Sequence, residues 1–164
     1  MSKMLVIGHS VLDRIYCKEK LTIKPGGIFH SINTLVNLIE EDNEIYLATH
    51  FSDDSFKFFA DTYKEVNLKY SKVTKSIPTV TLHLHDDKER DEHYSKITQK
   101  IDIENIDFSE FDIILVNMIS GFDIDFSDLQ NIRKKSNAII YFDLHTLSRG
   151  IDESGKRKFR VMLT

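Results

Sequence analysis

Cysteine, proline, glycine and tryptophan are all scarce in this sequence, and the shortages limit what the protein can be. Cys17 is the only cysteine among 164 residues, so one chain can form neither a disulfide framework nor a thiolate zinc site. No apolar run is long enough to cross a bilayer, and the first residues hold too short a run for a signal peptide. We therefore expect a cytoplasmic protein with no membrane partner.

Charge and length narrow the class further. The net charge is −4, which argues against a nucleic acid or an anionic membrane as the main partner. A chain of 164 residues can bury one sizeable core but hardly two. The sequence thus predicts a single domain without nucleic-acid binding.

Apolar runs typical of buried strands alternate with segments of helical periodicity. We expect strands at 4–8, 44–49, 111–117 and 138–143, and helices at 28–40, 53–63 and 127–134. A further short strand is expected at 68–73, and the carboxylates of Asp53 or Asp54 are expected to cap the second helix. Repeated alternation of strand and helix indicates an α/β fold with a parallel sheet.

A second kind of strand follows Pro78. Residues 79–85 alternate polar and apolar side chains, residues 86–91 form a charged turn, and residues 92–95 return. Such alternation predicts a hairpin with one solvated face, unlike the buried strands of the main sheet. His83, His85 and His93 lie in this hairpin, but alternating histidines that face water explain the pattern better than a metal site, and we predict no metal.

The double glycine Gly26-Gly27 lies between extended backbone at Pro25 and the expected helix that begins at Ile28. A helix N-terminus presents free backbone N–H groups and the positive end of the helix dipole. That surface suits a polyhydroxylated or anionic small molecule. The alternative is a plain strand-to-helix turn.

Asp13 follows the first strand, at the edge where open α/β sheets bind ligands. An ionised carboxylate offers about four acceptor sites and could hold vicinal hydroxyl groups. The alternative is a carboxylate in a loop that faces solvent.

The order of these elements resembles the ribokinase or PfkB family of sugar kinases. The resemblance rests on Asp13, on Gly26-Gly27 before a helix, on the segment 51–56 and on Pro78-Thr79 before the alternating strand. It implies a Rossmann-like parallel sheet flanked by helices, with a small β-lid. The core would comprise residues 1–13, 25–73 and 97–150, and the lid strands residues 14–24 and 78–95 of one truncated domain.

The resemblance also implies a sugar or nucleoside as the small-molecule partner. Asp13, Gly26 and Gly27 match positions that contact the sugar in that family, with His30 and Ser31 as further contacts. Two positions depart from the pattern. Ser31 stands where asparagine is common, and Ser52 stands where glycine is usual.

The catalytic elements of such kinases are missing from this sequence. It has no Gly-Ala-Gly-Asp motif, which in the family carries the general base, and it ends on an apolar run without a terminating signal. We therefore expect the N-terminal portion of a kinase, with the C-terminal half missing, no catalytic residue and no cofactor. ATP and Mg²⁺ are implied for a full-length relative, and we expect this chain to be inactive alone.

A different class of protein fits the same features. The chain would then be a non-catalytic module, derived from such a kinase, that binds a small molecule or dimerises. The hairpin at 79–95 favours this alternative, because lid strands in the family can pair across subunits as a homodimer, and an unpaired strand edge favours association.

Overall fold

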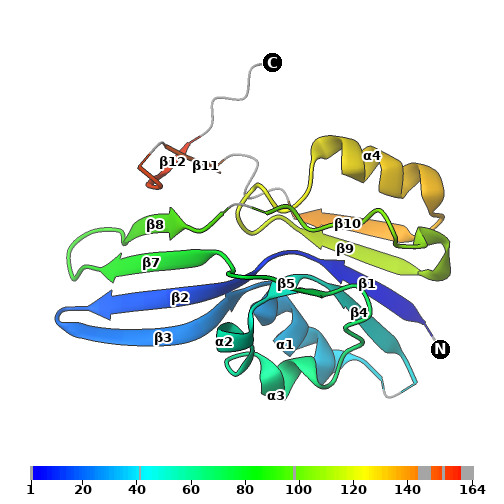
Figure 1. Cartoon of the computed structure of the whole chain (residues 1–164), viewed down its shortest axis with the longest axis horizontal. Helices are drawn as coiled ribbons and strands as arrows, with labels where there is room; N and C mark the ends of the chain where they lie inside the picture. Colours follow the sequence, from blue (N-terminus) through cyan, green and yellow to red (C-terminus); the bar gives the residue numbers. More distant parts are fainter. Residues whose placement is uncertain (1, 41, 98, 144–148, 153, 160–164) are drawn as a thin grey trace.

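A four-stranded parallel sheet forms the centre of the protein (Figure 1). The computed structural model describes residues 2–40, 42–97, 99–143, 149–152 and 154–159. The strands of this sheet, in spatial order, are β10 (Ile139–Asp143), β9 (Ile113–Asn117), β1 (Lys3–Ile7) and β4 (Glu44–Ala48). The expected parallel α/β sheet is confirmed.

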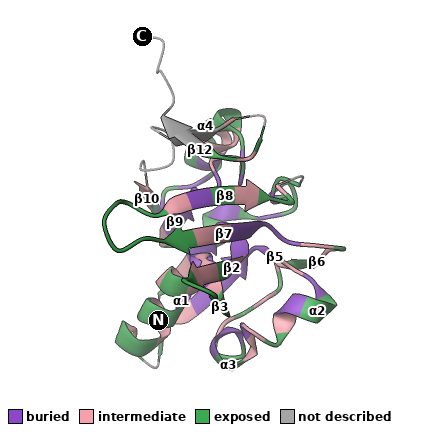
Figure 2. Ribbon diagram, turned by 90° about the vertical axis from the view of Figure 1, so that its left-hand side faces the viewer, coloured by how far each residue is buried: buried purple, intermediate pink, exposed green. Residues whose placement is uncertain are grey.

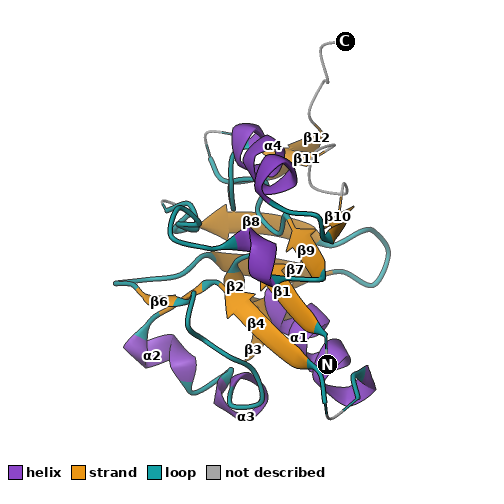
Figure 3. Ribbon diagram, turned by 90° about the vertical axis from the view of Figure 1, so that its right-hand side faces the viewer, coloured by secondary structure: helices purple, strands orange, loops and turns teal. Residues whose placement is uncertain are grey.

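Both faces of the sheet are covered at β1 and β4, which explains their continuous apolar runs, whereas Ile139 and Tyr141 on the edge strand β10 are exposed. The helices are α1 (Ile28–Leu38), α2 (Asp53–Phe56), α3 (Ala60–Tyr63) and α4 (Phe126–Lys135), with the 3₁₀ turn η1 (Phe108–Glu110). Val6 packs with residues of α1 and α3, whereas its neighbours Leu5 and Ile7 pack with residues of η1 and α4. Figure 3 shows α1 and α4 on opposite sides of the sheet.

A second sheet projects from one end of the first, and we call it the lid sheet. Its strands, in spatial order, are β3 (Lys20–Gly27), β2 (Ser10–Cys17), β7 (Thr79–Leu84) and β8 (Asp91–Ser95). The turn between β7 and β8 is exposed (Figure 2), in agreement with its run of charges. Only Gly8 and His9 separate β1 from β2, so the lid sheet is rooted directly in the core.

The remaining strands are short. They are β5 (His50–Phe51) paired with β6 (Lys72–Val73), and β11 (Arg149–Ile151) paired with β12 (Arg157–Phe159). Instead of a full strand at 68–73, the chain makes one bridge from Asn67 to Tyr46 and then the two residues of β6. None of the described helices has the length and apolar character needed to cross a membrane.

Two local predictions differ from the structure. Asp13 lies within β2, paired opposite Lys24, and not in a loop. The helix expected at 53–63 is two helices, because tight hydrogen bonds such as Phe59 N to Phe56 O at 2.9 Å turn the chain between them. This turn lets Phe56 pack on Phe51 while Phe59 stacks on Tyr63 in the core.

The cap of α2 also differs from the expectation. Ser52 is the N-cap, in a reciprocal capping box with Ser55, and Asp53 and Asp54 occupy the first turn. The two carboxylates still favour the helix N-terminus through its dipole, but they do not supply the cap itself.

Candidate functional site

A cavity of about 310 Å³ lies between the lid sheet and the first turn of α1. Its walls come from β2, β3, α1, β7, β8 and the segment after β9. The lining residues are Val11, Asp13, Gly27, His30, Val80, Leu82, Arg90, Glu92, Tyr94 and Ile119. The structure therefore brings three of the sequence-predicted residues, Asp13, Gly27 and His30, to one cavity.

Asp13 supplies the carboxylate of this cavity. Burial raises the pKa of Asp13 above its usual value, the charges of His30 and Arg90 offset part of this rise, and Glu92 adds to it. A carboxylate in such a place is poorly solvated in its ionised form, so hydroxyl donors from a ligand would stabilise it.

Gly26 makes room for that carboxylate. A Cβ built on Gly26 would lie 2.3 Å from Oδ2 of Asp13, so any side chain there would displace it. The absence of a side chain at Gly26 thus leaves space for the Asp13 carboxylate, and Gly26 does not itself line the cavity. A direct contact between Gly26 and a ligand stays a prediction.

Gly27 is the residue whose backbone only glycine adopts readily. It has φ 65° and ψ −133°, and a Cβ built there would lie 2.4 Å from the carbonyl oxygen of His9. It is the N-cap of α1, no side chain caps this helix, and its first turn has no acidic residue. Backbone N–H groups at this end of α1 are thus without a side-chain acceptor, as the double glycine suggested.

The lid contributes a polar wall that sequence reasoning missed. In the turn just before β8, the Nε–H of Arg90 donates to Oε1 of Glu92 at 2.8 Å, and on β8 the hydroxyl of Tyr94 lies 3.4 Å from Oε2 of Glu92. Glu92 is only 6% exposed despite its charge. Its spacing of two from Tyr94 on an alternating strand placed both side chains on one face, and this signal was available in the sequence.

Ser31 does not line the cavity. Its hydroxyl accepts a hydrogen bond of 3.0 Å from Nδ2 of Asn117, at the end of β9. The buried Oδ1 of Asn117 has no hydrogen-bond partner among the described residues. Asn117 is a second residue that the sequence analysis did not single out.

The three histidines of the lid hairpin have separate neighbours, and His93 pairs with Thr81 in the lid sheet. His83 stacks on Tyr16 with ring centroids 4.9 Å apart, and Nε2 of His85 lies 2.8 Å from Oδ2 of Asp91. Across the described part of the chain, no group of three or more histidine, cysteine or acidic side chains is arranged to hold a metal ion.

Comparison with known proteins places the fold. No protein-family model and no curated protein matches the sequence. Solved structures do match. A pyrophosphate-dependent kinase in the ribokinase family, complexed with a pyrophosphate analogue and myo-inositol, has a TM-score of 0.74 at 13% identity, over 98% of this chain and 55% of that chain.

Two ribokinases give similar results. The enzyme from Thermotoga maritima has a TM-score of 0.61 at 17% identity, over 93% of this chain and 55% of that one. The enzyme from Cryptococcus neoformans has a TM-score of 0.66 at 13% identity, over 88% and 51%. The protein thus has the ribokinase-like fold, as the sequence resemblance implied, and the chain spans about half the length of the solved structures it matches.

Proposed function

We propose that this chain is the substrate-binding, lid-bearing part of a PfkB-type carbohydrate or nucleoside kinase. In the complete enzyme a substrate hydroxyl would attack the γ-phosphate of ATP. The observation that carries the proposal is the shared cavity of Asp13, Gly27 and His30 beneath a β-lid, in a chain with the ribokinase-like fold.

The chemistry of the cavity suits a neutral, polyhydroxylated ligand. Asp13 would accept hydrogen bonds from hydroxyl groups, and the uncapped start of α1 would donate to their oxygens. Arg90 already pairs with Glu92, so the arginine among the described lining residues is partly neutralised, which favours a neutral ligand over an anionic one. Gly26 leaves room for the Asp13 carboxylate, His30 is a further contact in the cavity, and Ser31, whose hydroxyl is bonded to Asn117 outside the lining, is not a direct contact.

Phosphoryl transfer depends on charges positioned around the transferred phosphate. ATP and Mg²⁺ are implied by the resemblance, but the described residues offer no cluster of ligands that fits the metal. We propose that the isolated chain binds substrate without turning over ATP.

A panel titration tests the proposal. Isothermal calorimetry with neutral sugars, inositols and nucleosides is expected to detect binding of at least one, and Asp13→Asn is expected to weaken it by about tenfold or more. Asp87→Asn, in the exposed lid turn, is the matched control. No binding across the panel, or equal binding by Asp13→Asn, would contradict the proposal.

The second candidate function is a non-catalytic binding or dimerisation module. It is favoured by Leu21 and Ile23 on β3, the edge strand of the lid sheet, which are 39% and 42% exposed. Such an edge favours pairing with a second copy. Light scattering distinguishes the two: a dimer that Ile23→Lys converts to a monomer supports this role, and a monomer at all concentrations contradicts it.

A further inference from the structure

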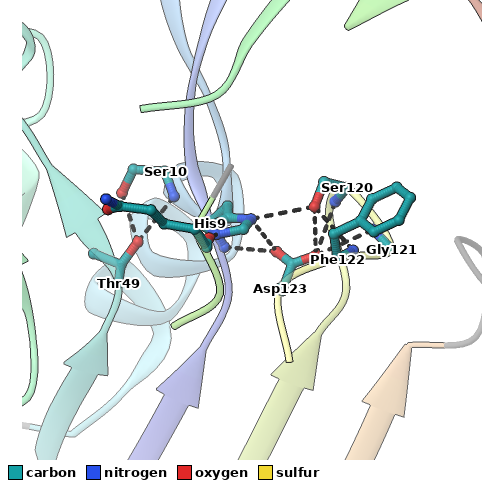
Figure 4. A network of polar contacts seen from close by, with 8 residues as sticks. His9, Ser10, Thr49, Ser120, Gly121, Phe122 and Asp123 are labelled. Atoms are coloured by element: carbon teal, nitrogen blue, oxygen red, sulfur yellow. Dashed lines mark hydrogen bonds and ion pairs between the residues drawn. The ribbon is translucent and has the colours of Figure 1, made fainter. Parts of the chain in front are cut away.

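A fully buried histidine lies against a fully buried aspartate (Figure 4). His9 and Asp123 each have 0% exposure, and Nδ1 of His9 is 3.1 Å from Oδ1 of Asp123. His9 joins β1 to β2, and Asp123 lies in the loop between β9 and α4. Neither residue lines the cavity.

Every other described partner of Asp123 is a hydrogen-bond donor. The backbone N–H groups of His9, Ser120 and Gly121 donate to its carboxylate at 2.8, 2.9 and 3.1 Å, and the Ser120 hydroxyl donates at 3.0 Å. Burial would raise the pKa of Asp123, but the bonds from His9 and Ser120 outweigh burial and lower it. The three backbone N–H groups and the Ser120 hydroxyl favour the ionised carboxylate whatever the form of the His9 ring.

Both ring nitrogens of His9 face acceptors. Nε2 lies 2.9 Å from the carbonyl oxygen of Gln99, which can only accept a hydrogen bond. At Nδ1, a lone pair would face the carboxylate of Asp123, whereas an N–H there is attracted to it. The Ser120 hydroxyl, 3.2 Å from Nδ1, is already committed to Asp123. With that hydroxyl hydrogen on Asp123, hydrogen on both nitrogens, the imidazolium form, satisfies both contacts of the ring.

The pair connects the segments that build the cavity. The carbonyl of His9 accepts from the N–H of Ile28 at 2.9 Å and lies directly against Gly27. Ser120 follows Ile119, which lines the cavity, and Gln99 lies on the return from β8. On the other side, the N–H of Ser10 is fixed by the hydroxyl of Thr49 at 2.8 Å.

We propose that His9 and Asp123 are positioning residues, a buried imidazolium–carboxylate pair that holds the Gly27 turn and the root of the lid sheet in register. The His9–Asp123 pair would affect ligand binding only by shaping the cavity, so that part of the inference rests on the proposed function. The charged pair itself does not.

Nitrogen-15 NMR of the histidine rings in the unmodified chain tests the pair directly. At neutral pH, His9 is expected to show hydrogen on both nitrogens. His50 is the internal reference: its ring lies 6.1 Å from that of His9, and burial, together with the charges of His9 and Lys72, lowers the pKa of His50 to about 4. His50 should therefore show one nitrogen without hydrogen. A neutral His9 ring would overturn the proposal.

Hydrogen exchange separates positioning from general stability. In His9→Gln, protection of the Ile28 and Gly121 amides is expected to fall about tenfold while that of Ile114 in β9 is kept. His85→Gln, in the exposed His85–Asp91 pair, is the matched control and should change none of them. Unchanged protection at Ile28, or an equal loss at Ile114, would overturn the positioning role. If no ligand of the panel binds but NMR shows an imidazolium at His9, only the proposed function would be contradicted.

Discussion

Two aspartates on either side of the same backbone turn show how the cavity and its support differ. Asp13 lies in the cavity, where burial raises its pKa, and Asp123 lies outside it, where hydrogen bonds lower its pKa. A ligand that donates hydrogen bonds would stabilise the carboxylate of Asp13, whereas the protein itself supplies the hydrogen-bond donors for Asp123. The contrast is that between a binding group and a structural one, and it follows from the partners of each side chain rather than from its residue type.

The largest loss of stability is expected when Asp123, whose carboxylate accepts several hydrogen bonds, is changed. Asp123→Asn removes the charge opposite His9 and turns an amide group toward backbone N–H donors. Breaking one half of a buried ion pair costs about 3 kcal/mol or more, so the free energy of unfolding should fall by that amount. Urea denaturation measures it, and a loss below about 1 kcal/mol would mean that the pair is not charged.

The next largest loss of stability is expected at Gly27, and it should exceed the loss at Gly26. Gly27→Ala places a Cβ against the His9 carbonyl at positive φ, and we expect a loss of about 2 kcal/mol. Gly26→Ala meets only the side chain of Asp13, which can rotate, so its loss should be smaller. Denaturation of both variants gives the comparison, and an equal or larger loss for Gly26→Ala would contradict it.

Asp13→Asn should leave stability unchanged or slightly higher at pH 7 while it weakens ligand binding. The pKa of Asp13 is raised in the folded state, so between its unfolded and folded pKa values the folded chain binds more protons than the unfolded one. The free energy of unfolding therefore falls as pH rises through that interval. The neutral amide removes this loss. Denaturation of both forms at pH 4 and pH 7 measures the difference, and a variant less stable at pH 7 would contradict the expectation.

Asp123 should show the opposite pH dependence. Its pKa is lowered in the folded state, so its contribution is present above the ordinary aspartate pKa and is lost as pH falls through the folded value. The stability difference between the native chain and Asp123→Asn should therefore shrink in acid. A difference that grows as pH falls would contradict this assignment.

The smallest effect is expected at the other histidine–aspartate pair. His85 and Asp91 lie on the exposed side of the lid hairpin, where water and salt compete with the ion pair. His85→Ala should leave the denaturation midpoint unchanged. A clear loss would show that burial does not account for the importance of the His9 pair.

The sequence predicted the main sheet because its strands are apolar and its central strand β1 is buried on both faces. Continuous apolar runs such as 4–8 and 111–117 identify such strands, and the glycine pair at 26–27 identified the start of α1. The placement of Asp13 within β2 was not predicted, since strand pairing with Lys24 depends on contacts between distant segments. The single helix expected at 53–63 was wrong for a local reason, because the hydrogen bond from Phe59 N to Phe56 O turns the chain between α2 and α3.

The sequence predicted some of the residues that line the cavity and missed others. Asp13 and Gly27 were found because a strand end and a double glycine leave local signals. Arg90 and Glu92 come from the far side of the lid, and only the pairing of β8 with β7 brings them to the cavity. His9 and Asp123 are 114 residues apart, so their contact left no local pattern at all.

The most direct test of the proposed binding site is an amide NMR titration of the chain with the sugar, inositol or nucleoside that binds most tightly. The account predicts that the signals of Gly27 and His30 shift on binding, and that Asp13→Asn abolishes the shifts while Asp87→Asn keeps them. Shifts confined to residues outside the cavity, or shifts that persist unchanged in Asp13→Asn, would contradict it.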